Sequence, residues 1–278
     1  MRPAVLVLVT ACGRVGFDPT TNVWSQGELT LEPPTPMTEL NTAAVESECF
    51  VRGDRMYYAR TSTTSAHDIW TATRTGSDAP FTNPVLVPAI STSSAEGRLV
   101  TGDGLHWYFW SCRPGSSGAD IWNVNGELAN ANAHVVAGLD SGVSEYDPWP
   151  TPDNSRLYFM MFASVKQIYV VDLLAPDVAS APRLIGVESG NGEDNPALTS
   201  DERFIVFASD RRGGAGGSDL WYARRSDRDA PFGPAQPLPV VNSPAMDSEP
   251  CITDEGELFF SSDRGGNVDL YQSRFIVK

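Results

Sequence analysis

Residues 247–274 read DSEPCITDEGELFFSSDRGGNVDLYQSR, and residues 194–225 read DNPALTSDERFIVFASDRRGGAGGSDLWYARR. Each stretch has an acidic residue before a short strand, a turn, an apolar strand, a Ser-Asp-Arg loop with glycines, and a third strand that begins with Asp. Weaker copies of the same pattern occupy residues 145–172, 96–124 and 46–74. A period of about 50 residues that carries strands and no helix indicates a β-propeller with one repeat per blade. Five copies therefore predict an all-β, five-bladed propeller.

Composition agrees with a single β-rich domain. The chain has 278 residues, with 24 Gly and 21 Pro to supply tight turns between short strands. Its formal net charge is −15. Nucleic acid is not expected as a partner, because its binding depends on basic residues that neutralise phosphates.

The fourth, outermost strand of each blade is predicted from short apolar segments with Pro or Gly close by. They lie between successive repeats, at residues 81–90, 133–140, 181–188 and 232–242. Proline fits there because an edge strand leaves one row of backbone groups unpaired. No such segment follows the last repeat. We therefore expect residues 28–32 to lie beside residues 269–275 and to close the ring as the fourth strand of the last blade.

The N-terminus has an apolar run followed by Val9-Thr10-Ala11-Cys12. A small residue directly before Cys resembles the lipobox of bacterial lipoproteins, in which the Cys receives a lipid and the preceding peptide is removed. The resemblance implies a signal peptide at residues 1–11, lipidation at Cys12 and a tether over 12–25, with the propeller at 26–278. The alternative is an ordinary buried strand, since the segment is shorter than most signal peptides.

The repeat itself resembles the TolB-type, WD40-like propeller repeat. The shared pattern is an acidic residue, a Pro three positions later, an aromatic-rich strand, Ser-Asp-Arg with glycines, and Asp-Leu/Ile-Trp/Tyr. The resemblance covers almost the whole chain after residue 28 and implies a propeller outside the cytoplasm. TolB has six blades and an additional α/β domain, whereas this chain shows five repeats and no such domain. The resemblance thus implies the fold more strongly than it implies the function of TolB.

Two sets of charged residues recur in the repeats. The Ser-Asp-Arg loops favour a structural role, because a catalytic group occurs once per site and not once per blade. The acids near the start of each inner strand are candidates for a ring at one mouth of the central channel: Glu48, Glu96, Glu145, Glu193, Asp194, Asp247 and Glu249. Such a ring could hold Ca²⁺, another cation or a basic ligand. Alternatively, each acid accepts hydrogen bonds from backbone amides of the neighbouring blade.

Two enzyme classes are weighed against a binding role. Arabinanase-like glycosidases place carboxylates at the mouth of a five-bladed propeller, and four tryptophans could stack on sugars: Trp107, Trp110, Trp122 and Trp149. These rings more often fill the spaces between blades. A TolB-like lyase would need a His-bound metal, and three scattered histidines do not suggest one: His67, His106 and His134.

Cys49 and Cys251 occupy the same position of the repeat, in blades that become neighbours when the ring closes. They form either a disulfide across the seam or two small buried apolar side chains.

These observations favour a non-catalytic lipoprotein of the bacterial cell envelope, facing the periplasm or the outer membrane. We expect a monomer without a required cofactor that binds a protein, a glycan or a cation at the channel mouth and contacts the membrane only through its lipid anchor. The alternative is a glycan-active enzyme that uses carboxylates at that mouth.

Overall fold

The computed structural model describes residues 23–25, 28–61, 66–116, 118–128 and 132–276. The predicted signal peptide and the lipidation site at Cys12 lie outside these residues. Within the described ranges, no helix is long and apolar enough to cross a membrane.

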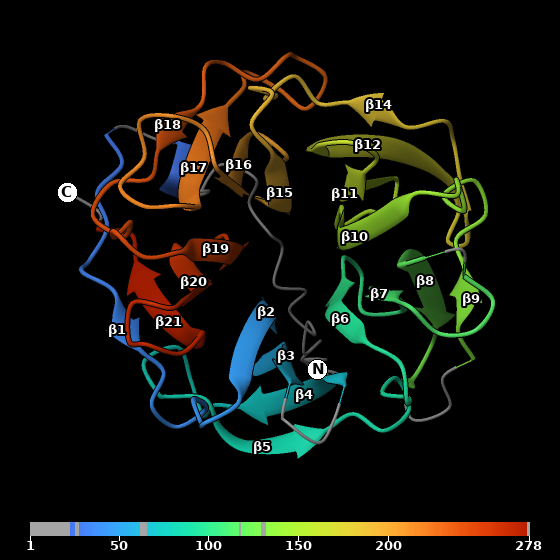
Figure 1. Cartoon of the computed structure of the whole chain (residues 1–278), viewed down its shortest axis with the longest axis horizontal. Helices are drawn as coiled ribbons and strands as arrows, with labels where there is room; N and C mark the ends of the chain where they lie inside the picture. The colour runs from blue at the N-terminus through green and yellow to red at the C-terminus, as the bar shows by residue number, and fades with distance from the viewer. Residues whose placement is uncertain (1–22, 26–27, 62–65, 117, 129–131, 277–278) are drawn as a thin grey trace, which may run out of the picture.

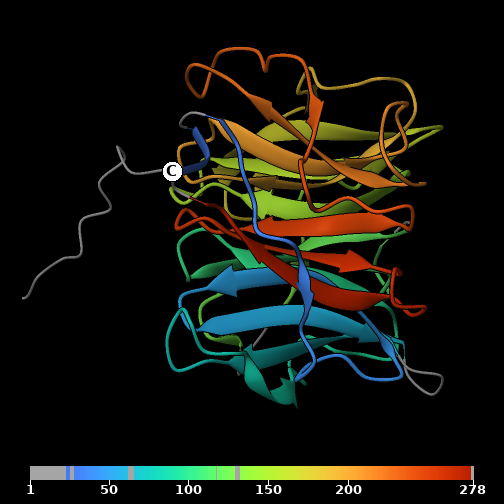
Figure 2. The same ribbon diagram turned by 90° about the vertical axis from the view of Figure 1, so that its left-hand side faces the viewer.

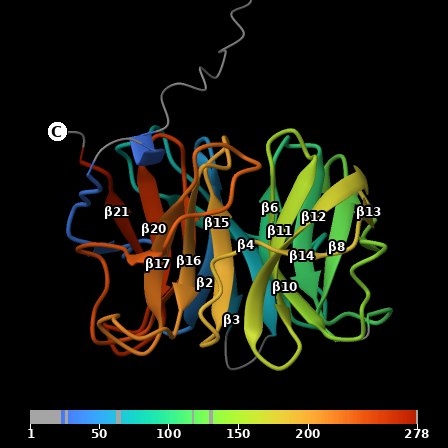
Figure 3. The same ribbon diagram turned by 90° about the horizontal axis from the view of Figure 1, so that it is seen from above.

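Five antiparallel sheets surround a central axis, and their strands run between the two faces of a disc (Figures 1 and 3). The first blade consists of β2 (Val45–Arg52), β3 (Arg55–Thr61), β4 (His67–Thr73) and β5 (Thr82–Leu86). The second consists of β6 (Glu96–Thr101), β7 (His106–Ser111), β8 (Asp120–Asn125) and β9 (His134–Val135). The third consists of β10 (Ser144–Pro150), β11 (Arg156–Phe162), β12 (Lys166–Ala175) and β14 (Arg183–Leu184), with β13 (Val178–Ala179) also paired to β12.

The fourth blade consists of β15 (Glu193–Leu198), β16 (Phe204–Ser209), β17 (Asp219–Arg224) and β18 (Gln236–Pro237). The fifth consists of β19 (Asp247–Ile252), β20 (Glu257–Ser262), β21 (Asp269–Arg274) and β1 (Thr35–Pro36). The prediction of five blades with one repeat each is confirmed. The predicted outer strands also form, although three of the four keep only two paired residues.

Sequence explains the position of each strand within its blade. Middle strands such as β16, with the sequence FIVFAS, are buried along their whole length, because neighbouring blades pack on both of their faces. They therefore read as continuous apolar runs instead of alternating ones. Outer strands such as β18 are exposed and contain proline. The core thus lies between the blades, and the four tryptophans considered for sugar stacking are each at most 7% exposed within the fold.

The ring is closed by both ends of the chain. β1 pairs with β21 through Thr35 and Pro36, and Leu31 forms a further bridge to Phe275. The backbone N–H of Glu32 donates to the carbonyl of Arg274 at 2.9 Å. Figure 2 shows this blue segment along the edge of the red fifth blade. The predicted closure is confirmed, although the assigned strand lies a few residues after the predicted 28–32.

A short 3-10 helix, η1 (Val23–Ser25), packs against the propeller. Trp24 is fully buried, stacks on Phe204 at 5.3 Å, and its indole N–H donates to the carbonyl of Thr253 at 2.7 Å. The segment joins blades four and five. The last residues of the stretch predicted as a tether therefore lie against the fold.

Candidate functional site in the central channel

Every inner strand carries a β-bulge at the same place. In β2 the pairing with β3 shifts between Ser47 and Phe50, so that two residues of β2 face one residue of β3. The same shift occurs in β6, β10, β15 and β19. The first residue of each bulge has a left-handed φ of 50° to 56°, and these residues, the channel cluster, are Glu48, Arg98, Asp147, Asn195 and Glu249. Non-glycine residues adopt this conformation only where the surrounding structure imposes it.

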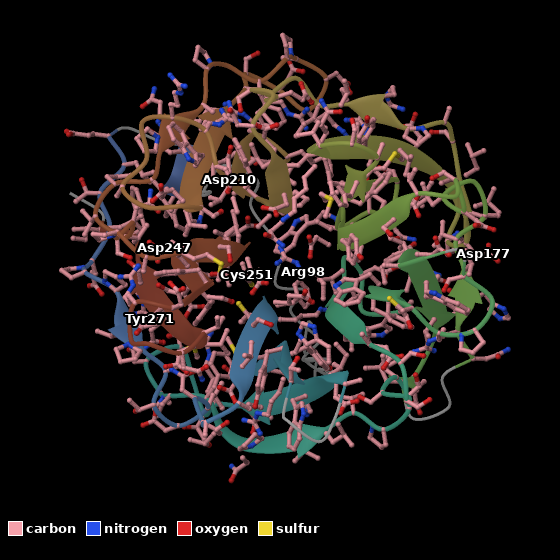
Figure 4. The ribbon with its side chains drawn as sticks, in the orientation of Figure 1. Arg98, Asp177, Asp210, Asp247, Cys251 and Tyr271 are labelled. Atoms are coloured by element: carbon pink, nitrogen blue, oxygen red, sulfur yellow. The ribbon has the colours of Figure 1, made fainter. Side chains whose placement is uncertain are left out.

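Arg98 crosses the channel. Its Nη2 donates to the carbonyl oxygens of Pro196 at 3.0 Å and Pro250 at 2.8 Å, which belong to the fourth and fifth blades. The guanidinium also lies 5.4 Å from the ring centroid of Trp149 in the third blade. Its side chain is fully buried, and Figure 4 shows it at the centre of the ring. This single arginine from the second blade therefore contacts the third, fourth and fifth blades across the axis.

Glu48 and Glu249 meet in the channel where the first and fifth blades adjoin. The backbone N–H of Glu48 and the hydroxyl of Ser261 both donate to Oε2 of Glu249, at 3.2 and 2.6 Å. Trp110 donates its indole N–H to Oε2 of Glu48 at 2.9 Å. Gly97 leaves the room for this contact, because a Cβ there would lie 1.9 Å from the same oxygen.

Burial controls the protonation of the channel carboxyls. Burial raises the pKa of Glu48 well above its ordinary value, and the negative charges of Asp147 and Glu249 raise it further, although Arg98 opposes them. The pKa of Asp147 rises to about 7, again mainly through burial and against the effect of Arg98. Burial therefore favours the protonated form of the Glu48 carboxyl, and Asp147 titrates near neutral pH.

The channel mouth lies where the inner strands begin. Lys166, the first residue of β12, forms an ion pair with Asp194 at 2.5 Å. Burial raises the pKa of Asp194 while Lys166 lowers it, and the net shift is upward. On the opposite side, His67 contacts the hydroxyl of Ser47 at 3.0 Å. Burial lowers the pKa of His67, so its imidazole is neutral at pH 7. The mouth thus combines an ion pair, an imidazole and a hydroxyl.

A second set of acids, the anchor acids, opens or nearly opens the inner strands. All are fully buried: Glu46, Glu96, Glu145, Glu193 and Asp247. Each accepts a hydrogen bond from the Ser or Thr four residues earlier. In the second blade, for example, Thr92 donates its N–H to Glu96 at 2.9 Å and its hydroxyl at 2.5 Å. These carboxylates therefore hold the loop that arrives from the preceding blade.

An arginine joins the anchor acid in four blades. The pairs are Arg60 with Glu46, Arg113 with Glu96, Arg211 with Glu193, and Arg264 with Asp247. Arg211 also donates to the carbonyl of Val187 at 2.7 Å and lies 4.9 Å from the ring of Phe207 and 5.2 Å from that of Trp221. The arginine of the repeat thus fastens a loop between a carboxylate and aromatic rings, which is the structural role expected from the sequence.

The third blade departs from this scheme. Its β11–β12 hairpin is short, and no ion pair to Glu145 is found among the described residues. Burial raises the pKa of Glu145 to about 8, while the hydroxyl of Ser141 opposes the shift. Protonation therefore replaces the missing arginine at this position.

The structure divides the seven predicted site residues into three groups. Glu48 and Glu249 belong to the channel cluster, and Asp194 lies at the mouth. The remaining four are anchor acids, whose partners lie within or next to their own blade: Glu96, Glu145, Glu193 and Asp247. Three channel residues were missed by sequence reasoning: Arg98, Asp147 and Asn195. The signal that could have found them is position, two residues after each anchor acid, since the residue type there varies.

The arrangement of possible metal ligands bears on the cation site considered from the sequence. Within the described ranges, no group of three or more His, Cys, Asp or Glu is arranged to hold a metal ion. The histidines lie apart: His106 pairs with Asp103 and His134 lies next to Asn132, both away from His67.

The two cysteines at the seam are both buried free thiols. The prediction that they occupy equivalent positions is wrong. Cys49 is the second residue of the β2 bulge, whereas Cys251 pairs with Phe259 just after the β19 bulge.

Two surface hollows lie away from the channel. One, of about 620 Å³, borders the outer edge of the fourth blade near Tyr222 and Pro237. The other, of about 140 Å³, lies at the seam near Arg74 and Glu257. Neither is lined by a residue of the channel cluster.

No protein-family model matches this sequence, and comparison with curated proteins finds no significant match. Solved structures do share the fold. TolB from Acinetobacter baumannii aligns over 81% of this chain and 52% of its own, with 13% identity and a TM-score of 0.51. This chain therefore spans about half the length of that TolB. A protein assigned as TolB from Agrobacterium tumefaciens aligns over 91% of this chain and 100% of its own, with 14% identity and a TM-score of 0.53.

A glycoside hydrolase is equally similar in shape. The α-L-arabinofuranosidase from Podospora anserina, solved with cellotriose, aligns over 87% of this chain and 95% of its own. Its identity is 13% and its TM-score is 0.59. At this level of identity the likeness shows a common propeller fold, and the TolB-like architecture expected from the repeats is confirmed.

Proposed function

We propose that this protein is a non-catalytic binding scaffold of the bacterial cell envelope. Its ligand docks at the channel mouth, over Asp194 and Lys166, on the face where loops from all five blades converge. The partner is a protein, a glycan or a cation.

The observation that carries this proposal is the closed channel. Arg98 is fully buried across the axis, while Glu48 and Asp147 are only 7% and 3% exposed. A general acid or base must reach the bond it acts on within hydrogen-bonding distance. Carboxyls this deeply covered do not meet that requirement for a sugar chain, so a ligand would contact the mouth above them.

The envelope location rests on the repeat and on the N-terminal sequence. TolB-type repeats occur in proteins outside the cytoplasm, and Cys12 follows a lipobox-like segment. A lipid at Cys12 would keep a monomeric propeller at the membrane surface without a membrane-spanning segment.

Two measurements on the purified protein test the scaffold role. A glycan array and calorimetry with Ca²⁺ would be run on the wild type and on Lys166→Ala, which removes the exposed cation of the mouth, with Arg183→Ala as the matched surface control. We expect glycan binding that Lys166→Ala weakens at least several-fold, Ca²⁺ binding that Lys166→Ala strengthens because it frees the Asp194 carboxylate, and no change in either with Arg183→Ala. Binding that is the same in Lys166→Ala as in the wild type would contradict docking at the channel mouth.

A specific observation also favours a glycan-active enzyme. Carboxyls from three blades, Glu48, Asp147 and Glu249, enter one channel, and the pKa values of Glu48 and Asp147 are raised. A glycosidase needs one carboxyl kept protonated beside one that is ionised. Release of reducing sugar from arabinan and other polysaccharides is the assay. Turnover that disappears in both Glu48→Gln and Asp147→Asn would replace the scaffold role with this one.

A further inference from the structure

We infer that Cys49 and Cys251 are a thiol pair that forms a disulfide across the seam of the ring and joins the first blade to the last. This inference does not depend on the proposed ligand, because it concerns closure of the fold, but it rests on the proposed envelope location for the oxidising compartment that it requires.

The backbone brings the two residues together. β2 and β19 are adjacent inner strands in contact along the seam. The backbone N–H of Glu48, directly before Cys49, donates to the side chain of Glu249, two residues before Cys251. Both sulfur-bearing side chains are fully buried in the same core, and the thiol of Cys251 adds to the effect of burial in raising the pKa of Cys49.

The one-residue offset between the two cysteines supports the pairing. Equivalent residues of neighbouring blades are held apart by the blade spacing. Cys49 occupies the extra position created by the β2 bulge, whereas Cys251 resumes the regular ladder of β19. Both strands share the bulge, so it is this one-residue offset between the cysteines that departs from the symmetry of the blades and lets the thiols meet. Figure 4 shows Cys251 beside Arg98, near the centre of the ring.

The reaction is a thiol–disulfide exchange with a small disulfide such as oxidised glutathione. One thiolate attacks that disulfide and releases one glutathione. The second thiolate then displaces the other glutathione, so that the protein loses two protons and two electrons and two glutathione molecules are formed. Burial raises the pKa of Cys49 well above its ordinary value. Exchange is therefore slow in the folded protein and occurs as the ring closes during folding, in an oxidising compartment.

The other two cysteines must be removed so that only Cys49 and Cys251 contribute to the thiol measurements. Cys112 is exposed, and Cys12 lies outside the described residues, so both would be replaced by Ser in the full chain. This C12S/C112S protein would be refolded with reduced and oxidised glutathione. It would then be analysed by thiol titration in denaturant and by intact mass.

We expect no titratable thiol and a mass lower by about 2 Da than that of the reduced protein. Because the bond closes a long loop of the unfolded chain, the protein refolded in dithiothreitol should have a Tm about 10 °C lower than the oxidised protein. Further substitution by Cys49→Ala or Cys251→Ala should remove this sensitivity to the reductant, and the parent protein with and without dithiothreitol suffices if either fails to fold. Two titratable thiols after oxidative refolding, glutathione adducts alone, or a Tm unaffected by dithiothreitol would each overturn the inference.

Discussion

Gly97 stands beside the bulge of β6 at a point where the channel has no space for a side chain. A Cβ there would lie 2.4 Å from the buried ring of Trp110 as well as against Glu48. Gly97→Ala should lower the free energy of unfolding by about 1–3 kcal/mol, because overpacking moves the Trp110 ring. Urea denaturation followed by tryptophan fluorescence measures the change.

Gly217→Ala is the matched control for this substitution. Its Cβ would meet nothing within 4 Å, and the residue lies in an exposed loop. Equal effects of the two substitutions would show that crowding in the channel is not the cause.

Glu145 and Glu193 are equivalent anchor acids in different electrostatic surroundings. Glu193 pairs with Arg211 at 3.0 Å, whereas burial raises the pKa of Glu145 to about 8. Glu193→Gln should destabilise the fold at pH 7 by about 1–3 kcal/mol, since it leaves a partly buried arginine without its carboxylate. Glu145→Gln should instead stabilise it at pH 8 relative to pH 4, by at most about 5 kcal/mol, because the pKa rises from 4.5 to about 8 and each pKa unit corresponds to about 1.4 kcal/mol.

The pH dependence of Glu145→Gln gives a second check. A raised pKa means that the folded protein retains a proton that the unfolded chain has released above about pH 4.5. The wild-type residue therefore loses stability as pH rises from there to about 8. The advantage of Gln should vanish at pH 4, and an advantage that is the same at both pH values would contradict the assigned protonation.

At the scale of elements, the seam is held by charged groups as well as by strand pairing. Arg74, just after β4, donates to both carboxylate oxygens of Glu257 in β20, at 2.5 and 2.9 Å. Both side chains are 7% exposed. Arg274 joins Glu257 at 3.4 Å and Asp78 at 2.8 Å. The network links the first blade to the last on the face opposite the channel mouth.

Breaking this pair should loosen the ring. Arg74→Ala leaves Glu257 buried without its main partner and should cost about 3–5 kcal/mol in thermal or urea unfolding. The comparison is Arg183→Ala, which removes an ion pair to Asp172 in which both side chains are nearly half exposed, and which should cost at most about 1 kcal/mol. Similar losses in both variants would mean that burial of the seam pair adds nothing.

At the scale of the whole molecule, the blades form a closed ring around buried acids. Asp147, in the channel, has a pKa raised to about 7 by burial, compared with 3.8 as its ordinary value. Its contribution to stability is therefore greatest below pH 4 and is lost as pH rises to about 7. The stability of Asp147→Asn relative to wild type should rise between pH 5 and pH 8. Parallel stability curves for the two proteins over that range would refute the shift.

Some features could be read from single residues of the repeat. The arginines of the Ser-Asp-Arg loops hold their blades together as expected. In the two best-matching repeats the arginine is accompanied by a Gly-rich turn and an aromatic strand. The acids were recognised as important, but their division was not. Anchor acids and channel residues lie two positions apart, and an unbroken alternating strand would direct both to the same side. The channel residue is the first residue of the bulge, and its left-handed backbone turns it towards the axis. No single residue type in the sequence predicts that bulge.

The sequence by itself determined the all-β class, the number of blades and the use of both chain ends to close the ring, because each follows from local apolar patterns and their repetition. Only the tertiary structure decided which charges share the channel, since five strands distant in sequence must first be arranged around one axis. It also decided which acids retain protons. Protonation depends on how completely neighbouring blades exclude water from each carboxyl, and that exclusion exists only after the ring has closed.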